Sequence, residues 1–176
     1  AGDIADEDIE PVTASALEGV FRPLEWQVNA VNARRVADQR GIDVRESKTR
    51  RSEDFHSLVS VTVGDGTDSV TVDGTQFAGD DPRIVRIDGY RVEAVPHGHM
   101  LVARNEDVPG VIGFIGSVLG EHGVNIAGMF NGRDTIGGEA LSVYTLDDPV
   151  DDAVLAALDE DDRLIDTKYI ALDNGV

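Results

Sequence analysis

The sequence predicts an α+β fold made of two modules, and two patterns of apolar residues indicate it. Residues 58–95 alternate apolar and polar side chains with a period of two, which is typical of β-strands. Residues 110–122 and 150–161 instead place apolar side chains three and four positions apart, which is typical of helices. These helices alternate with further short strands, so we expect the second half of the chain to be built differently from the first.

The first module begins with two short predicted helices. Residues 6–21 carry apolar side chains at helical spacing, with acidic residues in the first turn, where the helix dipole favours negative charge. A second helix is expected within residues 29–41, because Gly41 follows its last apolar position as a stop signal. Residues 47–56 have no period and concentrate basic side chains, which predicts an exposed loop.

An antiparallel meander is predicted for the rest of the first module. Its four strands are expected at residues 58–63, 69–75, 83–88 and 91–95. Short turns rich in Gly and Asp separate them. Three aspartates fall within residues 64–73, but their spacing does not fit a calcium-binding loop, so a hairpin turn is expected there.

The second module is predicted to run strand, helix, strand, strand, helix, strand. These elements are expected at residues 100–105, 110–122, 124–130, 139–146, 150–161 and 166–172. This βαββαβ order is that of the ferredoxin-like fold, in which two helices cover one face of a four-stranded antiparallel sheet. We therefore predict domains at residues 1–97 and 98–176.

Glycines interrupt the first helix of the second module. Gly113, Gly116 and Gly120 fall three and four positions apart, and each costs about 1 kcal/mol relative to Ala inside a helix. The expected compensation is the close approach of this face to a strand or to another helix.

The net charge of −19 bears on whether the chain binds nucleic acid and on the salt concentration in which it is stable. It comes from 34 acidic against 15 basic residues. So acidic a chain repels phosphate backbones, and no nucleic-acid partner is expected. Dispersed like charge destabilises a fold at low ionic strength and is tolerated in molar salt, where the Debye length falls to about 3 Å. The composition therefore indicates an extreme halophile.

Several other classes of function are excluded by what the sequence lacks. The chain has no cysteine, which excludes disulfides, zinc-thiolate sites and iron–sulfur clusters from it. It has no run of about 18 apolar residues and no secretion signal, so we expect a cytoplasmic protein without a membrane partner. No nucleophile elbow, dinucleotide loop or phosphate-binding loop occurs, so no catalytic residue and no cofactor are assigned to this chain.

Two groups of residues in the middle of the chain are candidate ligand sites. His97 and His99 would share one face of a strand, but a metal needs a third ligand, so no metal site is predicted. Arg83, Arg86 and Arg91 lie on or beside adjacent predicted strands. They are either surface residues paired with the abundant aspartates or an anion pocket, because Arg binds phosphate and carboxylate bidentately.

The start of the helix at residue 110 is a candidate amino-acid site. A helix N-terminus offers unpaired N–H groups that receive a carboxylate, and Gly110 lets a ligand approach the backbone. Asp107 supplies a carboxylate for an ammonium group, and the amide of Asn125 can donate and accept. Together these groups match the polar ends of a free α-amino acid. The alternative is an ordinary helix with Asp107 near its dipole.

The sequence also resembles two known domain families. The stretches "NEDVPGVIGFIGSVLGEHGVNIAGM" and "GGEALSVYTLDD" resemble the ACT domain, a small-molecule sensing module of amino-acid metabolism. Residues 29–63 and 73–113 resemble the intervening, or allosteric substrate-binding, domain of long-form D-3-phosphoglycerate dehydrogenases. The resemblance covers nearly the whole chain.

The resemblance implies that L-serine, or another small amino acid, binds between paired ACT domains as a feedback inhibitor. The implied contacts come from both ends of the predicted helix: Asn105, Asp107, Val108, Pro109, Gly110, Val111, Asn125 and Ile126. Asn105 stands where relatives carry a ring-bearing side chain. Arg83 and Arg91 are the positions implied for a phosphorylated substrate or another anion. A homodimer through the ACT domains, and a homotetramer of the parent protein, are expected.

The parent implied by the resemblance oxidises 3-phosphoglycerate with NAD. Nothing in the chain resembles the nicotinamide-binding and substrate domains, so we expect a C-terminal regulatory region whose intervening domain is truncated at its N-terminus. Two alternatives stay open. One is the regulatory subunit of an iron–sulfur L-serine dehydratase, with the cysteines on another subunit, and the other is a free-standing amino-acid-binding regulator.

Overall fold

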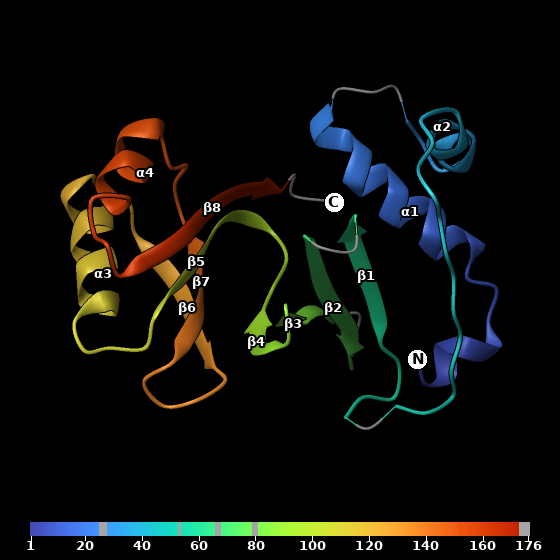
Figure 1. The fold of residues 1–176 in the computed structure, drawn as a ribbon, viewed down its shortest axis with the longest axis horizontal. Helices are drawn as coiled ribbons and strands as arrows, with labels where there is room; N and C mark the ends of the chain where they lie inside the picture. The colour runs from blue at the N-terminus through green and yellow to red at the C-terminus, as the bar shows by residue number, and fades with distance from the viewer. Residues whose placement is uncertain (25–27, 53, 66–67, 79–80, 173–176) are drawn as a thin grey trace. The chain divides into compact units, whose positions relative to one another are not determined.

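The computed structural model describes residues 1–24, 28–52, 54–65, 68–78 and 81–172 (Figure 1). The chain forms two compact units, Ala1–Val61 and Thr62–Val176. The domain division predicted after His97 lies inside the second unit and stays a prediction. Within the described ranges, no helix has both the length and the apolar character needed to cross a membrane.

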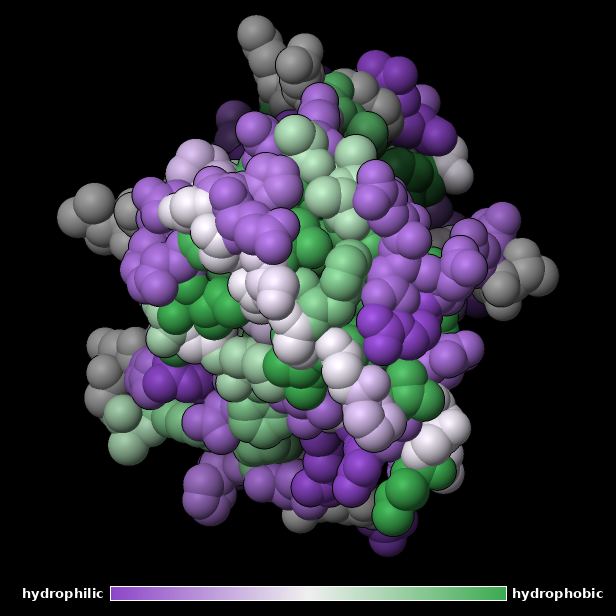
Figure 2. All heavy atoms as spheres, turned by 90° about the vertical axis from the view of Figure 1, so that its left-hand side faces the viewer, coloured by the Kyte–Doolittle hydropathy of each residue, from purple (hydrophilic) through white to green (hydrophobic). Residues whose placement is uncertain are grey.

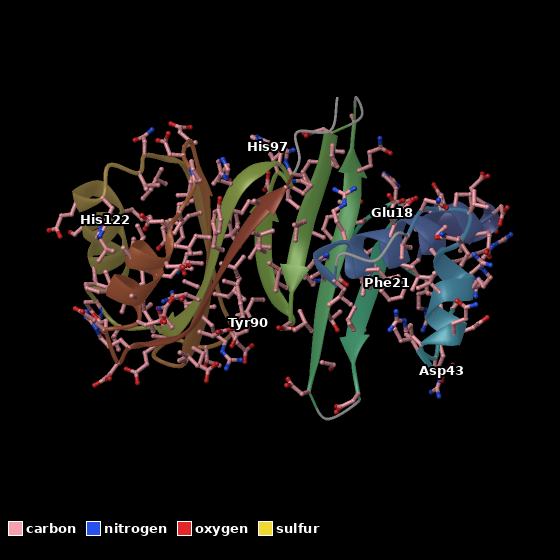
Figure 3. All side chains as sticks on the ribbon, turned by 90° about the horizontal axis from the view of Figure 1, so that it is seen from above. Glu18, Phe21, Asp43, Tyr90, His97 and His122 are labelled. Atoms are coloured by element: carbon pink, nitrogen blue, oxygen red, sulfur yellow. The ribbon has the colours of Figure 1, made fainter. Side chains whose placement is uncertain are left out.

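The first unit is built around two short helices. Its helical segments are the 3-10 turns η1 (Asp3–Asp6) and η2 (Arg22–Leu24) and the helices α1 (Glu10–Phe21) and α2 (Ala33–Gln39). Leu17 and Phe21 of α1 form a buried cluster with Ala33 and Ala37 of α2. Phe21, labelled in Figure 3, is fully buried. Both predicted helices are thus present, and each is shorter than its apolar pattern.

Basic side chains of this unit are joined to its N-terminal part by ion pairs and hydrogen bonds. Arg34 binds Glu10 through two hydrogen bonds of 3.1 and 3.0 Å and also contacts Glu46. Arg50 Nε donates to Asp6 at 2.8 Å, and Lys48 Nζ donates to the carbonyl oxygen of Glu7 at 2.6 Å. The predicted loop at residues 47–56 contains no helix or strand among its described residues.

All four strands of the predicted meander are confirmed. They are β1 (Val59–Gly64), β2 (Ser69–Phe77), β3 (Asp81–Ile87) and β4 (Tyr90–Ala94), in the sheet order β1-β2-β3-β4. Asp88 and Gly89 join β3 to β4 with φ angles of 48° and 84°. Two consecutive positive φ angles are what a two-residue hairpin of type I′ requires, and Asp-Gly is a preferred pair for it.

The βαββαβ order of the second module is confirmed as well. Its elements are β5 (Gly98–Glu106), α3 (Val111–Glu121), β6 (Ile126–Arg133), β7 (Glu139–Leu146), α4 (Asp152–Leu158) and β8 (Leu164–Leu172). The strands form one antiparallel sheet in the order β6-β7-β5-β8, which leaves β6 and β8 at the edges. This is the predicted ferredoxin-like arrangement, and β6 begins next to the end of α3.

Both faces of this sheet are covered within the second unit. On one face, α3 and α4 bury a cluster that includes Leu101, Ile115, Leu119 and Tyr144. On the other face, side chains of β3 and β4 pack on the sheet in a second cluster. A Cβ atom at Gly132 of β6 would lie 2.1 Å from the carbonyl oxygen of Arg91, so the backbone of β4 passes directly over this glycine.

The glycines of α3 do not have the packing role that was expected from the sequence. A Cβ atom added at Gly113, Gly116 or Gly120 would meet no atom within 4 Å in the described part of the chain. The outer side of α3 is therefore open within one chain. Figure 2 looks onto the side of the molecule that carries α3 and α4, where apolar side chains lie among hydrophilic ones, and Ile112 is 43% exposed there.

Candidate functional site

The turn between β5 and α3 is tied to the β6–β7 hairpin by Asp107. Its Oδ2 accepts hydrogen bonds from Arg133 Nη1 and from the backbone N–H of Gly137, both at 3.1 Å. The backbone N–H of Asp107 donates to the carbonyl oxygen of Gly138 at 2.8 Å. The Gly137 N–H, followed by the Arg133 guanidinium, holds the pKa of Asp107 below its usual value. The side chain is 19% exposed and carries a negative charge at neutral pH.

Gly110 begins α3 in a conformation that suits glycine. It is the N-cap residue with φ at 98°, and no side chain caps the helix there. Pro109 therefore precedes the cap. Arg163 Nη1 lies 3.5 Å from the carbonyl oxygen of Pro109, and a Cβ atom at Gly110 would lie 3.3 Å from the same nitrogen. Val111 is buried in the core and Val108 is partly exposed.

Asn105 contributes a buried amide beneath this turn. The residue is 3% exposed and lies on β5 between Ala140 of β7 and Leu164 of β8. Its Nδ2 donates to the carbonyl oxygen of Glu106 at 2.6 Å. Its Oδ1 is buried without a hydrogen-bond partner among the described residues. Leaving such an acceptor unsatisfied costs roughly 1–3 kcal/mol, so an additional donor at this point would be favourable.

Asn125 lies at the opposite end of α3. It sits between the helix end, marked by His122 in Figure 3, and Ile126, the partly buried first residue of β6. Its Nδ2 donates to Asp147 Oδ2 at 2.6 Å. The eleven residues of α3 span about 16 Å at 1.5 Å per residue. One chain therefore keeps Asp107 and Asn125 at the two ends of a helix and does not bring them together.

The two arginines considered for an anion site also lie apart. Arg83 on β3 stands opposite Thr75, forms an ion pair with Asp81 and lies over the ring of Phe77, 5.8 Å from its centroid. Arg91 on β4 stands opposite Arg86, three residues further along β3, which corresponds to about 10 Å of strand. An anion site at these positions stays a prediction.

His97 lies just before β5 and His99 lies on it. No group of three or more His, Cys, Asp or Glu side chains among the described residues could hold a metal ion. His97, labelled in Figure 3, lies on the connection between β4 and β5. His99 Nδ1 is 2.6 Å from the hydroxyl oxygen of Tyr169, and the two rings stack with centroids 6.0 Å apart.

Sequence reasoning missed the residues that surround Asp107. Arg133 is the last residue of β6, and Gly137 and Arg163 lie in two loops. All three lie 26 or more positions further along the chain. No period or spacing links them to the start of α3. The only signal in the sequence is the polar, Gly-rich stretch at residues 133–138, between two predicted strands.

Comparison with known families assigns both halves of the chain. The pattern of the D-3-phosphoglycerate dehydrogenase intervening domain matches residues 1–88, half of the chain. The chain belongs to this family. The ACT domain pattern matches residues 99–163, which include the turn at Asp107, α3 and Asn125.

Several D-3-phosphoglycerate dehydrogenases are similar to the chain over nearly its whole length. The protein of Archaeoglobus fulgidus is 40% identical over 175 residues, or 98% of this chain and 33% of the relative. The proteins of Bacillus subtilis and Methanocaldococcus jannaschii are 33% and 31% identical over 97% and 98% of this chain. The chain spans about a third of the length of these relatives. That third holds the intervening and ACT domains, the regulatory region expected from the sequence.

Proposed function

We propose that the chain is the regulatory region of an NAD-dependent D-3-phosphoglycerate dehydrogenase and that its ACT domain binds L-serine as a feedback inhibitor. In this proposal the parent enzyme oxidises 3-phosphoglycerate to 3-phosphohydroxypyruvate, the first step of L-serine biosynthesis. The two matched families and the names of the relatives support it. NAD has no place in this chain, because the sequence contains no Gly-rich dinucleotide loop.

The observation that carries the site assignment is the separation of Asp107 from Asn125 by α3. The ammonium and carboxylate groups of serine share one carbon atom, so one molecule cannot span about 16 Å. Edge strand β6 begins just after Asn125 and ends at Arg133, which contacts Asp107. Antiparallel pairing of two β6 edges about a two-fold axis therefore brings Asn125 of one chain toward Asp107 of the other. Each serine then lies between two chains.

The groups at the Asp107 end suit a zwitterion. The ionised carboxylate of Asp107 faces the ammonium group of the ligand. The backbone around Val108, Pro109, Gly110 and Val111 presents the N–H groups at the start of α3 to the ligand. The unpartnered Oδ1 of Asn105 accepts one further hydrogen from the ligand. Asn125 and Ile126 of the second chain close the site.

Inhibition follows if serine stiffens this pairing. A ligand shifts an equilibrium between two arrangements only by its differential affinity for them. Serine held between two ACT domains binds the paired arrangement and shifts the attached catalytic domains of the parent toward a less active state. The expected assembly is a homodimer through the ACT domains.

Titration calorimetry of the 176-residue chain in molar KCl tests the proposal. L-serine should bind, and Asp107→Ala and Asn125→Ala should each weaken binding by about tenfold or more, because each removes a hydrogen bond to a charged group of the ligand. Glu93→Ala, an exposed acid on β4, is the matched control. If no amino acid binds, or if both site variants keep the wild-type affinity, the assignment is wrong.

The pH dependence of serine binding gives a second test. Because the Gly137 N–H and Arg133 lower the pKa of Asp107, its carboxylate stays ionised to lower pH than that of an ordinary aspartate, which titrates near pH 3.9. Affinity should therefore stay constant as the pH falls from 7 and should be lost only in acid, as Asp107 becomes protonated, at a pH below that of an ordinary aspartate. A loss of affinity centred between pH 5 and pH 6 would assign the ammonium contact to another group.

A further inference from the structure

We infer that Arg133 binds the α-carboxylate of the effector, beside the ammonium held by Asp107. The inference rests on the proposed function and adds the residue that makes the site selective for amino acids over simple amines. Arg133 is the last residue of β6, and its side chain is 51% exposed. It stands where the edge of the sheet meets the start of α3, which is where the effector enters.

The guanidinium of Arg133 has N–H groups that are available to bind a ligand. A guanidinium carries five N–H donors, and Arg133 uses Nη1 for its hydrogen bond to Asp107 Oδ2. No other hydrogen bond or ion pair of Arg133 occurs with the described residues. The remaining donors can form the bidentate contact that Arg makes with carboxylates.

Asp107 likewise keeps one oxygen for a ligand. Both of its donors, Arg133 Nη1 and the Gly137 N–H, bind Oδ2, whereas Oδ1 accepts no hydrogen bond from the described residues. An ammonium group can therefore bind Oδ1 while the ion pair with Arg133 stays intact. Gly137 has φ at 74° and holds the β6–β7 loop on Asp107. Arg133 is therefore held in place both by this loop and by β6.

The charges of this pair match those of an amino acid. The pair presents one negative and one positive group whose closest atoms lie 3.1 Å apart, and an α-amino acid carries the opposite charges on groups attached to a single carbon. A zwitterion satisfies both members of the pair at once. An amine without a carboxylate binds only Asp107 and makes no contact with the guanidinium of Arg133.

Arg163, a second arginine near the start of α3, is already bound to other groups of the chain. Arg163 donates to Asp161 Oδ1 through Nε at 2.8 Å and also binds Asp161 Oδ2 through Nη2. This contact lowers the pKa of Asp161 to about 2. The third nitrogen, Nη1, faces the carbonyl oxygen of Pro109. Arg163 therefore supports the turn, and Arg133 is the arginine left to meet a carboxylate.

The test compares L-serine with L-serinamide, which keeps the ammonium and hydroxyl but lacks the carboxylate charge. Calorimetry of the 176-residue chain in molar KCl should show serine binding about 10- to 100-fold more weakly to Arg133→Gln than to the wild type, as expected for loss of charge-assisted hydrogen bonds. The affinity for serinamide should change by less than about threefold. Arg133→Lys should restore part of the affinity for serine, because it keeps the charge without the planar fork.

Arg104→Gln is the matched control, since Arg104 is an exposed arginine of the same sheet that lies 3.6 Å from Glu139. It should leave the affinity for serine unchanged, and circular dichroism should show that all variants are folded. Unchanged serine affinity in Arg133→Gln overturns this inference alone. Equal losses for serine and serinamide also overturn it, because Arg133 would then only position Asp107. Absence of amino-acid binding to the wild type overturns the proposed function and this inference together.

Discussion

The two faces of the sheet β6-β7-β5-β8 are covered in different ways. On the helix face, α3 and α4 stand off the sheet on large apolar side chains, and Ile115, Leu119 and Leu158 are fully buried there. On the strand face, β4 lies so close that no side chain fits between Gly132 and the backbone of Arg91. The helix face is thus packed through large side chains, whereas the strand face, which also buries an apolar cluster, includes a point where two backbones meet without a side chain between them.

This difference predicts opposite responses to substitution. Removing atoms should destabilise the helix face, because a cavity is left in a packed core. Adding a single carbon atom should destabilise the strand face, because two backbones are already in contact. Unfolding by urea in molar KCl, followed by circular dichroism, measures both effects on one scale.

The largest effect is expected for Ile115→Ala on the helix face. Ile115 is fully buried, so its truncation should lower the free energy of unfolding by about 2–5 kcal/mol. Ile112→Ala, on the same helix and 43% exposed, is the control and should cost less than about 1 kcal/mol. Equal losses in the two variants would show that this face is not packed as described.

A smaller loss is expected for Gly132→Ala on the strand face. Its new methyl group must displace the carbonyl oxygen of Arg91, which should lower the free energy of unfolding by about 1–3 kcal/mol. Gly128→Ala is the control on the same strand, because a Cβ atom there would meet no atom within 4 Å. A neutral Gly132→Ala would contradict the close approach of β4 to β6.

The smallest effect, and one of opposite sign, is expected for Gly116→Ala on the outer side of α3. A Cβ atom there meets nothing within 4 Å, and alanine favours a helix interior by about 1 kcal/mol over glycine. The free energy of unfolding should therefore rise by up to about 1 kcal/mol. A fall in stability that grows with protein concentration would instead show that a second chain packs against α3.

The sequence was sufficient for elements whose signal is local. The period of apolar residues predicted the βαββαβ order that the second module has, and Gly123, with φ at 74°, follows the last turn of α3. The second helix, α4, is shorter than its apolar pattern. It begins only after Asp151, whose Oδ1 accepts hydrogen bonds from the N–H groups of Ala153 and Val154.

Contacts between distant segments could not be predicted in this way. Asp107 was identified because it precedes a helix, but its partner Arg133 is 26 residues away and on another element. The glycine pattern of α3 suggested close packing, whereas Gly132, on an edge strand, is a glycine at which two segments do approach closely. Local propensity carries no information on which loops and strands meet in space.

If the effector binds at the proposed site, the length of α3 makes its binding depend on protein concentration. On the proposed site, the helix keeps the two groups of ligand contacts about 16 Å apart, so neither chain alone offers both. Effector and second chain are then thermodynamically linked, and each strengthens the binding of the other by the same factor. The fraction of regulatory regions with bound effector would thus depend on the concentration of the subunit as well as on that of the ligand.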